Sequence, residues 1–143
     1  MMNAIVKEAY TWLDTPHING AKVKGVGVDC GMLLIGCMEG AGIVEKDAIK
    51  IPPYSNEWHL HHSEEWFRYY VEEYCDPVTE MREGDFLLYQ YGRCCSHGAI
   101  YMGNGVVCHA VIDKGVILSN INDVQFLDSK GKSRLRGIYR VRR

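Results

Sequence analysis

The sequence lacks several features that would assign it to a broad class of protein. No apolar run is long enough to cross a membrane, and the opening MMNAIVKEAYTWL has no basic segment followed by an apolar one. We therefore expect synthesis in the cytoplasm without a signal peptide. Sixteen Lys and Arg residues face eighteen Asp and Glu residues, a formal net charge of -2, and no basic stripe alternates with aromatic residues before the tail 134–143. This pattern excludes nucleic acid as the main partner.

Internal repeats, low-complexity tracts and linkers are also missing. The 143 residues are 47% hydrophobic, which is enough to build one core without disulfides or a structural metal. We expect a single domain that spans residues 1–143.

The six cysteines contain no CxxC pair. Without an export signal they are expected to be thiols in a reducing compartment. A zinc site is the main alternative, because Cys94, Cys95, His97, Cys108 and His109 include enough ligands. Adjacent cysteines on an extended chain point to opposite faces, which argues against that site, and a second metal candidate is the loop cluster His59, His61 and His62. We predict no metal and no cofactor.

Helical signals occupy the first half of the chain. Apolar residues recur at helical spacing in 3–13, and Ser63 with two glutamates precedes an apolar face that runs to Tyr74. Between them, the Gly-rich stretch 15–28 predicts a long loop, and Asp29 is a good N-cap for a helix that begins at Cys30.

The second half has the texture of strands. The runs GDFLLYQY, HGAIYMG, VVCHAV, VILSNI and RGIYRVR are short, rich in β-formers and separated by Gly-containing turns. Helices followed by a meander indicate an α+β fold in which N-terminal helices pack on a C-terminal antiparallel sheet.

Cys30 is the best candidate for a reactive thiol, because it alone opens a predicted helix. The unpaired N–H groups and the dipole of a helix start favour a thiolate and can face an oxyanion. Burial as an ordinary core residue is the competing interpretation. His97 and His109 bracket one predicted hairpin, which suits a general base and the residue that orients it.

Strand parity limits this triad, because the two histidines must lie on one face of the sheet. A two-residue Asn104-Gly105 turn would place them on opposite faces. We therefore predict a three-residue loop, Gly103-Asn104-Gly105, with Met102 opposite Val106.

Three runs, WLDTPHINGAKVKGVGVDCGMLL, YSNEWHLHHSEE and GDFLLYQYGRCCSHGAIYMGNGVVCHA, resemble the NlpC-type cell-wall peptidases, especially short versions from bacteriophage and prophage tail-assembly regions. The resemblance covers nearly the whole chain. It implies a papain-like fold and a cysteine peptidase that cleaves peptidoglycan stem or crosslink peptides, commonly between D-γ-glutamyl and a diamino acid. It also implies phage tail proteins as partners and a bacterial cytoplasm or virion tail as the location.

The resemblance implies that Cys30 is the nucleophile, His97 the general base and His109 the residue that orients the base. Asp29, Gly31, Ser96 and His17 are expected to lie against the substrate. Two positions depart from the family pattern. Gly31 replaces a frequent Ser, and His17 replaces a frequent Tyr that is thought to line the oxyanion side.

Two other functions stay open. A non-catalytic tail-assembly component could keep the same fold, because a Cys–His pair shows only that the chemistry is possible. An amidase or acyltransferase could use the same pair on another amide, although no basic amphipathic helix suggests a lipid substrate.

Overall fold

The computed structural model describes residues 2–53 and 66–142. Helix α1 (Ala4–Tyr10) is capped by Asn3, whose side chain accepts the N–H groups of Ile5 and Val6. The remaining elements follow in chain order. They are β1 (Lys22–Val23), β2 (Gly27–Val28), α2 (Cys30–Gly40), α4 (Trp66–Tyr74), β3 (Cys75–Pro77), β4 (Phe86–Tyr91), β5 (Cys94–Gly103), β6 (Val106–Val111), β7 (Gly115–Asn120), the 3-10 helix η1 (Val124–Phe126) and β8 (Leu135–Val141).

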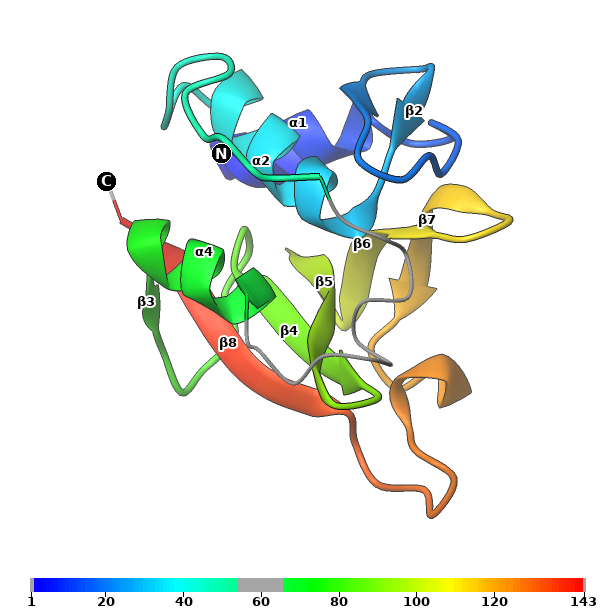
Figure 1. The fold of residues 1–143 in the computed structure, drawn as a ribbon. Helices are drawn as coiled ribbons and strands as arrows, with labels where there is room; N and C mark the ends of the chain where they lie inside the picture. The colour runs from blue at the N-terminus through cyan, green and yellow to red at the C-terminus, as the bar shows by residue number, and fades with distance from the viewer. Residues whose placement is uncertain (1, 54–65, 143) are drawn as a thin grey trace.

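The larger sheet has six antiparallel strands in the order β3-β8-β4-β5-β6-β7. Strands β4 to β7 form the predicted meander, and β8 returns to pair with β4 on its other side. Figure 1 shows α1 and α2 together on one side of this sheet and α4 beside β3 and β8. The expected α+β arrangement of helices on a C-terminal antiparallel sheet is confirmed.

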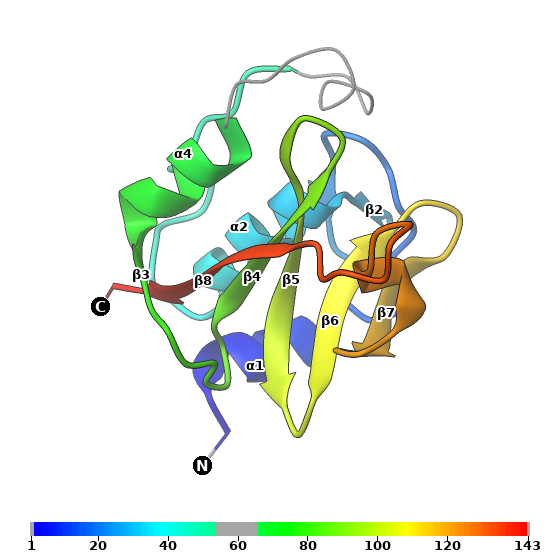
Figure 2. The same cartoon turned by 90° about the horizontal axis from the view of Figure 1, so that it is seen from below.

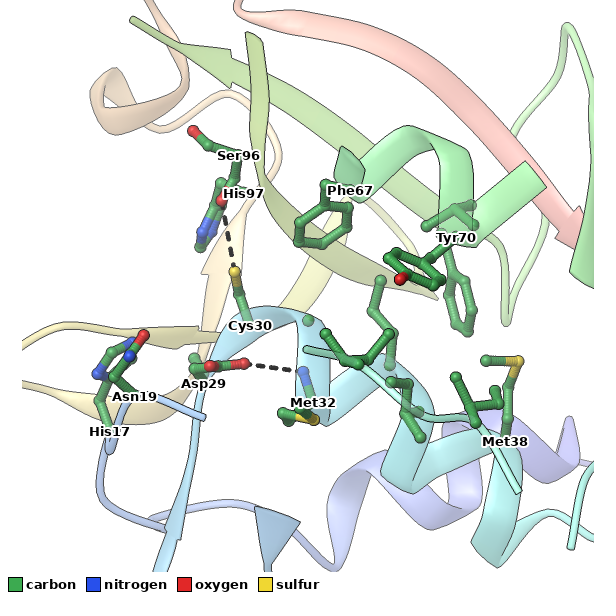
Figure 3. Close-up of a pocket in the computed structure, with 18 of the residues that line it drawn as sticks. His17, Asn19, Asp29, Cys30, Met32, Met38, Phe67, Tyr70, Ser96 and His97 are labelled. Carbon is green, nitrogen blue, oxygen red and sulfur yellow. Dashed lines mark hydrogen bonds between the residues drawn. The ribbon is translucent and has the colours of Figure 1, made fainter. Parts of the chain in front are cut away.

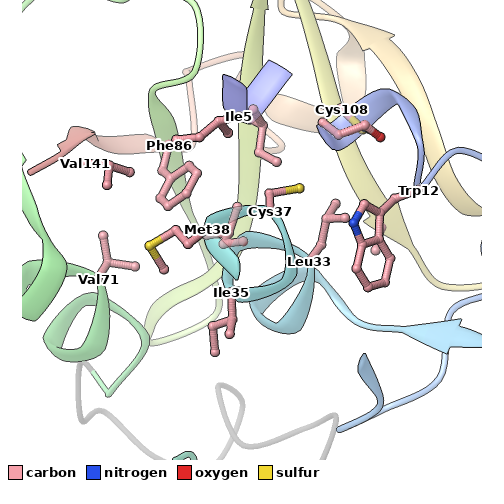
Figure 4. Close-up of a cluster of buried hydrophobic side chains, with 14 of the residues drawn as sticks. Ile5, Trp12, Leu33, Ile35, Cys37, Met38, Val71, Phe86, Cys108 and Val141 are labelled. Atoms are coloured by element: carbon pink, nitrogen blue, oxygen red, sulfur yellow. The ribbon is translucent and has the colours of Figure 1, made fainter. Parts of the chain in front are cut away.

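Helix α2 is the centre of the main core. Its residues from Leu33 to Met38 are all buried, because the helix packs against both α1 and the sheet. Figure 4 shows several of these side chains in the core. Gly36 lies inside this helix, although glycine weakens a helix, because there is no room for a side chain. A Cβ at this position would lie 2.6 Å from a ring carbon of Trp12, so the missing side chain makes room for the indole.

The opposite face of the sheet has a smaller cluster of buried residues and no long helix among the described residues. Figure 2 shows this face, where the chain between β7 and β8 crosses the strands. Phe126 of η1 is 2% exposed and stacks on Tyr89 of β4, with ring centroids 4.6 Å apart. The sheet is therefore buried on both faces near the middle of β4 and β5.

Most predicted elements are present, with differences at their ends. The five predicted strands correspond to β4–β8, but the short strands β1, β2 and β3 were not predicted. The first two form a small hairpin inside the stretch that was expected to be a loop. Of the third predicted helix, α4 lies in the described residues, and its predicted start at Ser63 lies outside them.

The predicted three-residue β5–β6 loop is wrong. Gly103 pairs with Val106, which leaves Asn104 and Gly105 as a two-residue turn with φ angles of 54° and 74°. Positive φ at both positions is the requirement of a type I′ turn, and Asn-Gly meets it well.

The consequence expected from that loop is nevertheless met. The pairing shifts between Tyr101 and Gly103, so Met102 is an extra residue on β5. This bulge restores the pairs Tyr101–Val107 and Ile100–Cys108. Continued by one residue, the register sets Ala99 opposite His109 and brings His97 to the same face.

No helix in the described part of the chain is both long enough and apolar enough to cross a membrane.

Candidate active site

Cys30 is the first residue of α2, as the sequence predicts. Asp29 caps the helix, with its Oδ1 accepting the N–H of Met32 at 2.9 Å and its Oδ2 accepting the N–H of Gly20 at 2.7 Å. The cap fixes the start of the helix and ties it to the preceding loop. Cys30 is the partly exposed member of the six cysteines, and the other five are buried thiols.

Strand β5 supplies the surface that Cys30 meets. It pairs with β4 as far as Cys94, whereas its pairing with β6 covers only Ile100–Gly103. At the N-terminal end of β5, which does not pair with β6, Ser96 is an extra residue between the pairs Tyr89–His97 and Gln90–Cys95. The thiol of Cys30 donates to the main-chain oxygen of Ser96 at 3.6 Å.

A glycine lets the helices approach this part of β5 closely. A Cβ on Gly98 would lie 2.8 Å from the Phe67 ring of α4 and 3.0 Å from a methyl of Leu34 in α2. Any side chain here would push α2 and α4 away from the strand. Gly98 therefore helps to set the position of Cys30 against Ser96.

His97 and His109 form the predicted pair. Nε2 of His97 lies 2.8 Å from Nδ1 of His109, and Nε2 of His109 lies 2.8 Å from Oγ of Ser119. His109 is fully buried. Because Nε2 of His97 is engaged, Nδ1 is the ring nitrogen left for a proton exchanged with Cys30.

Cys30, His97 and His109 are all uncharged in the resting site near neutral pH. Burial and the nearby Asp29 carboxylate raise the pKa of Cys30 to about 12, against the opposing effect of main-chain N–H groups of Gly98, Gly31 and Cys30 itself. The expectation of an easily ionised thiol is therefore wrong, since the loss of water outweighs the helix start. Burial, followed by the neighbouring His109 and His17, lowers the pKa of His97 to about 3. Burial also lowers the pKa of His109 to about 4.

A pocket of about 420 Å³ opens beside Cys30 and has two arms (Figure 3). The polar arm contains His17, Asn19 and Asp29. The apolar arm lies between α2 and α4, where Figure 3 shows Met38, Phe67 and Tyr70. Other described residues of its wall are Gly31, Met32, Leu34, Ile35, Ile49, Ile51, Pro52, Val71, Tyr74, Cys75, Phe86, Tyr91, Ser96, His97, Ala110, Val111, Ile112 and Gln125.

The four residues expected to contact substrate all line this pocket. His17 is half-buried, and its backbone bridges Val28 just before the helix. Asp29 is buried as the helix cap, and Gly31 lies beside Phe67. Ser96 meets Cys30 through its main-chain oxygen, while its hydroxyl donates to the main-chain oxygen of Tyr91 at 3.3 Å.

Three residues near the site were missed in the sequence. Ser119 makes two side-chain hydrogen bonds, one with Nε2 of His109 and one in which Nε2 of Gln125 donates to its Oγ at 3.3 Å. Tyr91 donates its hydroxyl to the main-chain oxygen of Gln125 at 2.6 Å and lies edge-on to His97. Strand alternation could have suggested Ser119, but nothing in the sequence places η1 beside it.

The zinc alternative gains no support from the geometry. Among residues 2–53 and 66–142, no three His, Cys, Asp or Glu side chains converge as a metal site. The candidate cluster His59, His61 and His62 lies outside the described residues.

The helix-start cysteine set against a histidine pair on an antiparallel sheet is the arrangement expected for a papain-like α+β fold. The model of the NlpC/P60 family matches residues 8–131. The chain belongs to the NlpC/P60 family.

Solved structures share the fold at low sequence identity. The NlpC/p60 domain of the peptidoglycan hydrolase SagA is 19% identical with a TM-score of 0.59, over 96% of this chain and 97% of that one. A lipoprotein-like NLP/P60 family protein from Staphylococcus aureus is 18% identical with a TM-score of 0.64, over 98% of this chain but 41% of that one.

One similar structure is described as non-catalytic. RipD of Mycobacterium tuberculosis, a non-catalytic NlpC/p60 domain protein adapted to peptidoglycan binding, is 17% identical with a TM-score of 0.55, over 97% of this chain and 94% of that one. A search of curated proteins found no match. Because relatives of the same fold differ in activity, the residues of the site have to carry the functional conclusion.

Proposed function

We propose that the protein is a cysteine endopeptidase that hydrolyses amide bonds in the stem or crosslink peptides of peptidoglycan, at the bond between D-γ-glutamyl and a diamino acid. The observation that carries this proposal is the hydrogen-bonded pair His97–His109 on neighbouring strands β5 and β6, with Cys30 against the start of β5. Family membership supports the cell wall as the substrate.

We assign the roles as follows. As the substrate amide enters, the Cys30 proton leaves Ser96 O for Nδ1 of His97 while the sulfur attacks the carbonyl carbon. His109 stabilises the resulting imidazolium through the 2.8 Å contact. N–H groups at the start of α2 face the oxyanion, His97 then protonates the leaving amine, and a water activated by His97 hydrolyses the acyl-enzyme.

The pocket is compatible with a peptide that crosses Cys30. Its polar arm has one carboxylate, that of Asp29, and the described lining contains no Lys or Arg. A negative polar arm favours an amino group of the substrate, such as that of a diamino acid. We assign His17, Gly31 and Ser96 to the walls on either side of the scissile amide.

Defined muropeptides provide the test. Wild-type protein should release fragments cut at the γ-glutamyl bond, as read by mass spectrometry, and Cys30→Ala should release none. Intact muropeptides with folded wild-type protein would contradict the proposal. The resemblance to phage tail peptidases further suggests action from a virion tail, with tail proteins as partners, and immunodetection of the chain in purified virions tests that placement.

A second function, peptidoglycan binding without catalysis, is favoured by one feature. The resting thiol donates to Ser96 O and has a raised pKa, so the site is not poised for attack without a rearrangement. Retention of wild-type protein on purified cell walls, with no released fragments, would support it.

A further inference from the structure

A chain of hydrogen bonds extends from His97 to the pocket wall. It runs from His97 on β5 to His109 on β6, Ser119 on β7 and Gln125 in η1, with successive separations of 2.8, 2.8 and 3.3 Å. Four separate elements supply its members. The proposed mechanism uses only the first two, so the role of Ser119 and Gln125 is open.

Gln125 is firmly positioned. The Tyr91 hydroxyl donates to its main-chain oxygen at 2.6 Å, and Asp123 caps η1 by accepting the N–H of Gln125. The next residue, Phe126, is buried against Tyr89. Gln125 also lines the pocket beside Cys30, so a bound substrate can reach it.

The hydrogen-bond chain permits two arrangements of its protons, a first order and a second order, which contain the same number of protons. In the first, His97 Nε2–H donates to His109 Nδ1, and His109 Nε2–H donates to Ser119 Oγ. His97 Nδ1 is then an empty acceptor for the Cys30 proton. In the second, the Ser119 hydroxyl donates to His109 Nε2, and His109 Nδ1–H donates to His97 Nε2. His97 Nδ1 then carries a proton and cannot act as a base.

The direction of the Gln125 contact favours the second order. Gln125 donates to Ser119, and a hydroxyl that accepts one hydrogen bond is strengthened as a donor for the next. The Cys30 thiol agrees with this order, because its proton goes to Ser96 O. We propose that Gln125 is a positioning residue that acts through Ser119 and His109 to hold His97 in the tautomer protonated on Nδ1.

Substrate binding removes the hydrogen bond from Gln125 to Ser119 that holds His97 in this tautomer. When a substrate carbonyl in the pocket takes the N–H of Gln125, or the amide turns its Oε1 to Ser119, the Ser119 hydroxyl no longer receives that donor. Ser119 Oγ can then accept Nε2–H of His109, which restores the first order. Gln125 thereby couples occupancy of the pocket to the basicity of His97, within the proposed peptidase function.

Gln125→Glu is the decisive variant. A carboxylate of the same size only accepts hydrogen bonds above its ordinary pKa of about 4.3. It must accept a hydrogen bond from the Ser119 hydroxyl, which then cannot donate to His109, and so fixes the first order. We expect 15N NMR of histidine-labelled protein at pH 7 to show His97 protonated on Nδ1 in the wild type and on Nε2 in Gln125→Glu. Turnover of a muropeptide should rise by about 10-fold, which is less than the roughly 10²–10⁴-fold contribution of a complete general base, because Gln125 only biases the tautomer of His97.

Two controls separate this role from a structural one. Gln125→Met keeps the size and removes both the donor and the acceptor, so it should give a mixture of tautomers. In a Ser119→Ala background, Gln125→Glu should change neither the tautomer nor the rate. Circular dichroism and thermal unfolding identify any variant that fails to fold, and the NMR comparison then rests on Gln125→Met and the wild type.

The NMR measurement needs no substrate, which separates the two proposals. The same His97 tautomer in wild type and Gln125→Glu, or wild-type His97 already protonated on Nε2, would overturn the role of Gln125 even if muropeptides are cleaved. A tautomer switch with no cleavage by any variant would support that role and contradict the peptidase function.

Discussion

The two faces of the six-stranded sheet differ in what covers them. The face toward α1 and α2 is covered by apolar side chains from both helices, and its described core extends to α4. The other face is covered near its centre by Phe126 and neighbours of η1, and it holds the His97–His109–Ser119 chain. Stability therefore depends mainly on the face covered by α1 and α2, the helical face. The proton chemistry depends on the face covered by η1, the η1 face. Cys30 meets that chemistry from the helical side at the end of β5.

The largest effect should come from the residue that joins the two faces. Cys30→Ala should lower hydrolysis by at least about 10³-fold, because it removes the nucleophile and the other five cysteines are buried, while the fold persists. The matched control is Cys37→Ala in the same helix, buried on the helical face, which should cost about 1 kcal/mol of unfolding free energy and leave turnover per folded molecule intact. Equal activity loss in both variants would contradict the separate roles of Cys30 in catalysis and of the helical face in stability.

A large truncation on the helical face should act on stability alone. Ile5 of α1 is 1% exposed and packs in the main core. Ile5→Ala therefore leaves a cavity, and we expect the unfolding free energy measured in urea to fall by about 3 kcal/mol. Phe126→Leu on the other face should cost less but reduce turnover, because its ring lies 5.3 Å from that of His109. Loss of turnover per folded molecule in Ile5→Ala would mean that the faces are coupled.

Acid should destabilise the protein through the η1 face. His97 and His109 have folded pKa values of about 3 and 4, below the ordinary value of about 6.5 for an unfolded histidine. The unfolded state therefore binds more protons below pH 6.5. Stability is full above that pH and falls toward pH 4 by about 1.4 kcal/mol per pH unit for each histidine. Urea unfolding from pH 7 to 4.5 checks this.

The double variant His97→Gln/His109→Gln provides the control for acid unfolding. Its stability should fall less steeply than that of the wild type over the same pH range, since the remaining loss comes from carboxylates. Parallel pH profiles of the two proteins would show that neither histidine is held neutral by the fold.

Alkylation should distinguish the cysteines by exposure and acidity together. Iodoacetamide should modify Cys30 before the five buried thiols, but more slowly at pH 7 than it modifies a free cysteine of pKa about 8.5. The rate should increase from pH 7 to pH 9. Peptide mapping that finds Cys94 or Cys95 modified first would remove Cys30 from the proposed role.

The smallest effect should be at His17, on the polar arm of the pocket. His17→Ala should reduce turnover by less than about 10-fold, because His17 acts on His97 only through charge and lies outside the hydrogen-bond chain. His17→Tyr, which restores the side chain frequent in the family, should recover part of that loss. Unchanged turnover in both variants would make the loop a spacer.

The sequence by itself determined the fold class, the helix start at Asp29-Cys30 and the residues of the Cys–His–His set. These are local features: an N-cap, a hydrophobic period and a strand alternation are each readable within a few residues. Even the Asn104-Gly105 turn followed its propensity, although we predicted a longer loop to bring the histidines to one face.

Only the tertiary structure decided how those residues meet. The bulge at Met102 corrected the strand register that a two-residue turn would have spoiled, and the extra Ser96 set a carbonyl against the Cys30 thiol. Burial between α2 and the sheet then raised the pKa of Cys30, against the expectation from its helix start. Bulges, contacts such as Ser119 to Gln125, and desolvation depend on segments distant in sequence, so no local pattern encodes them.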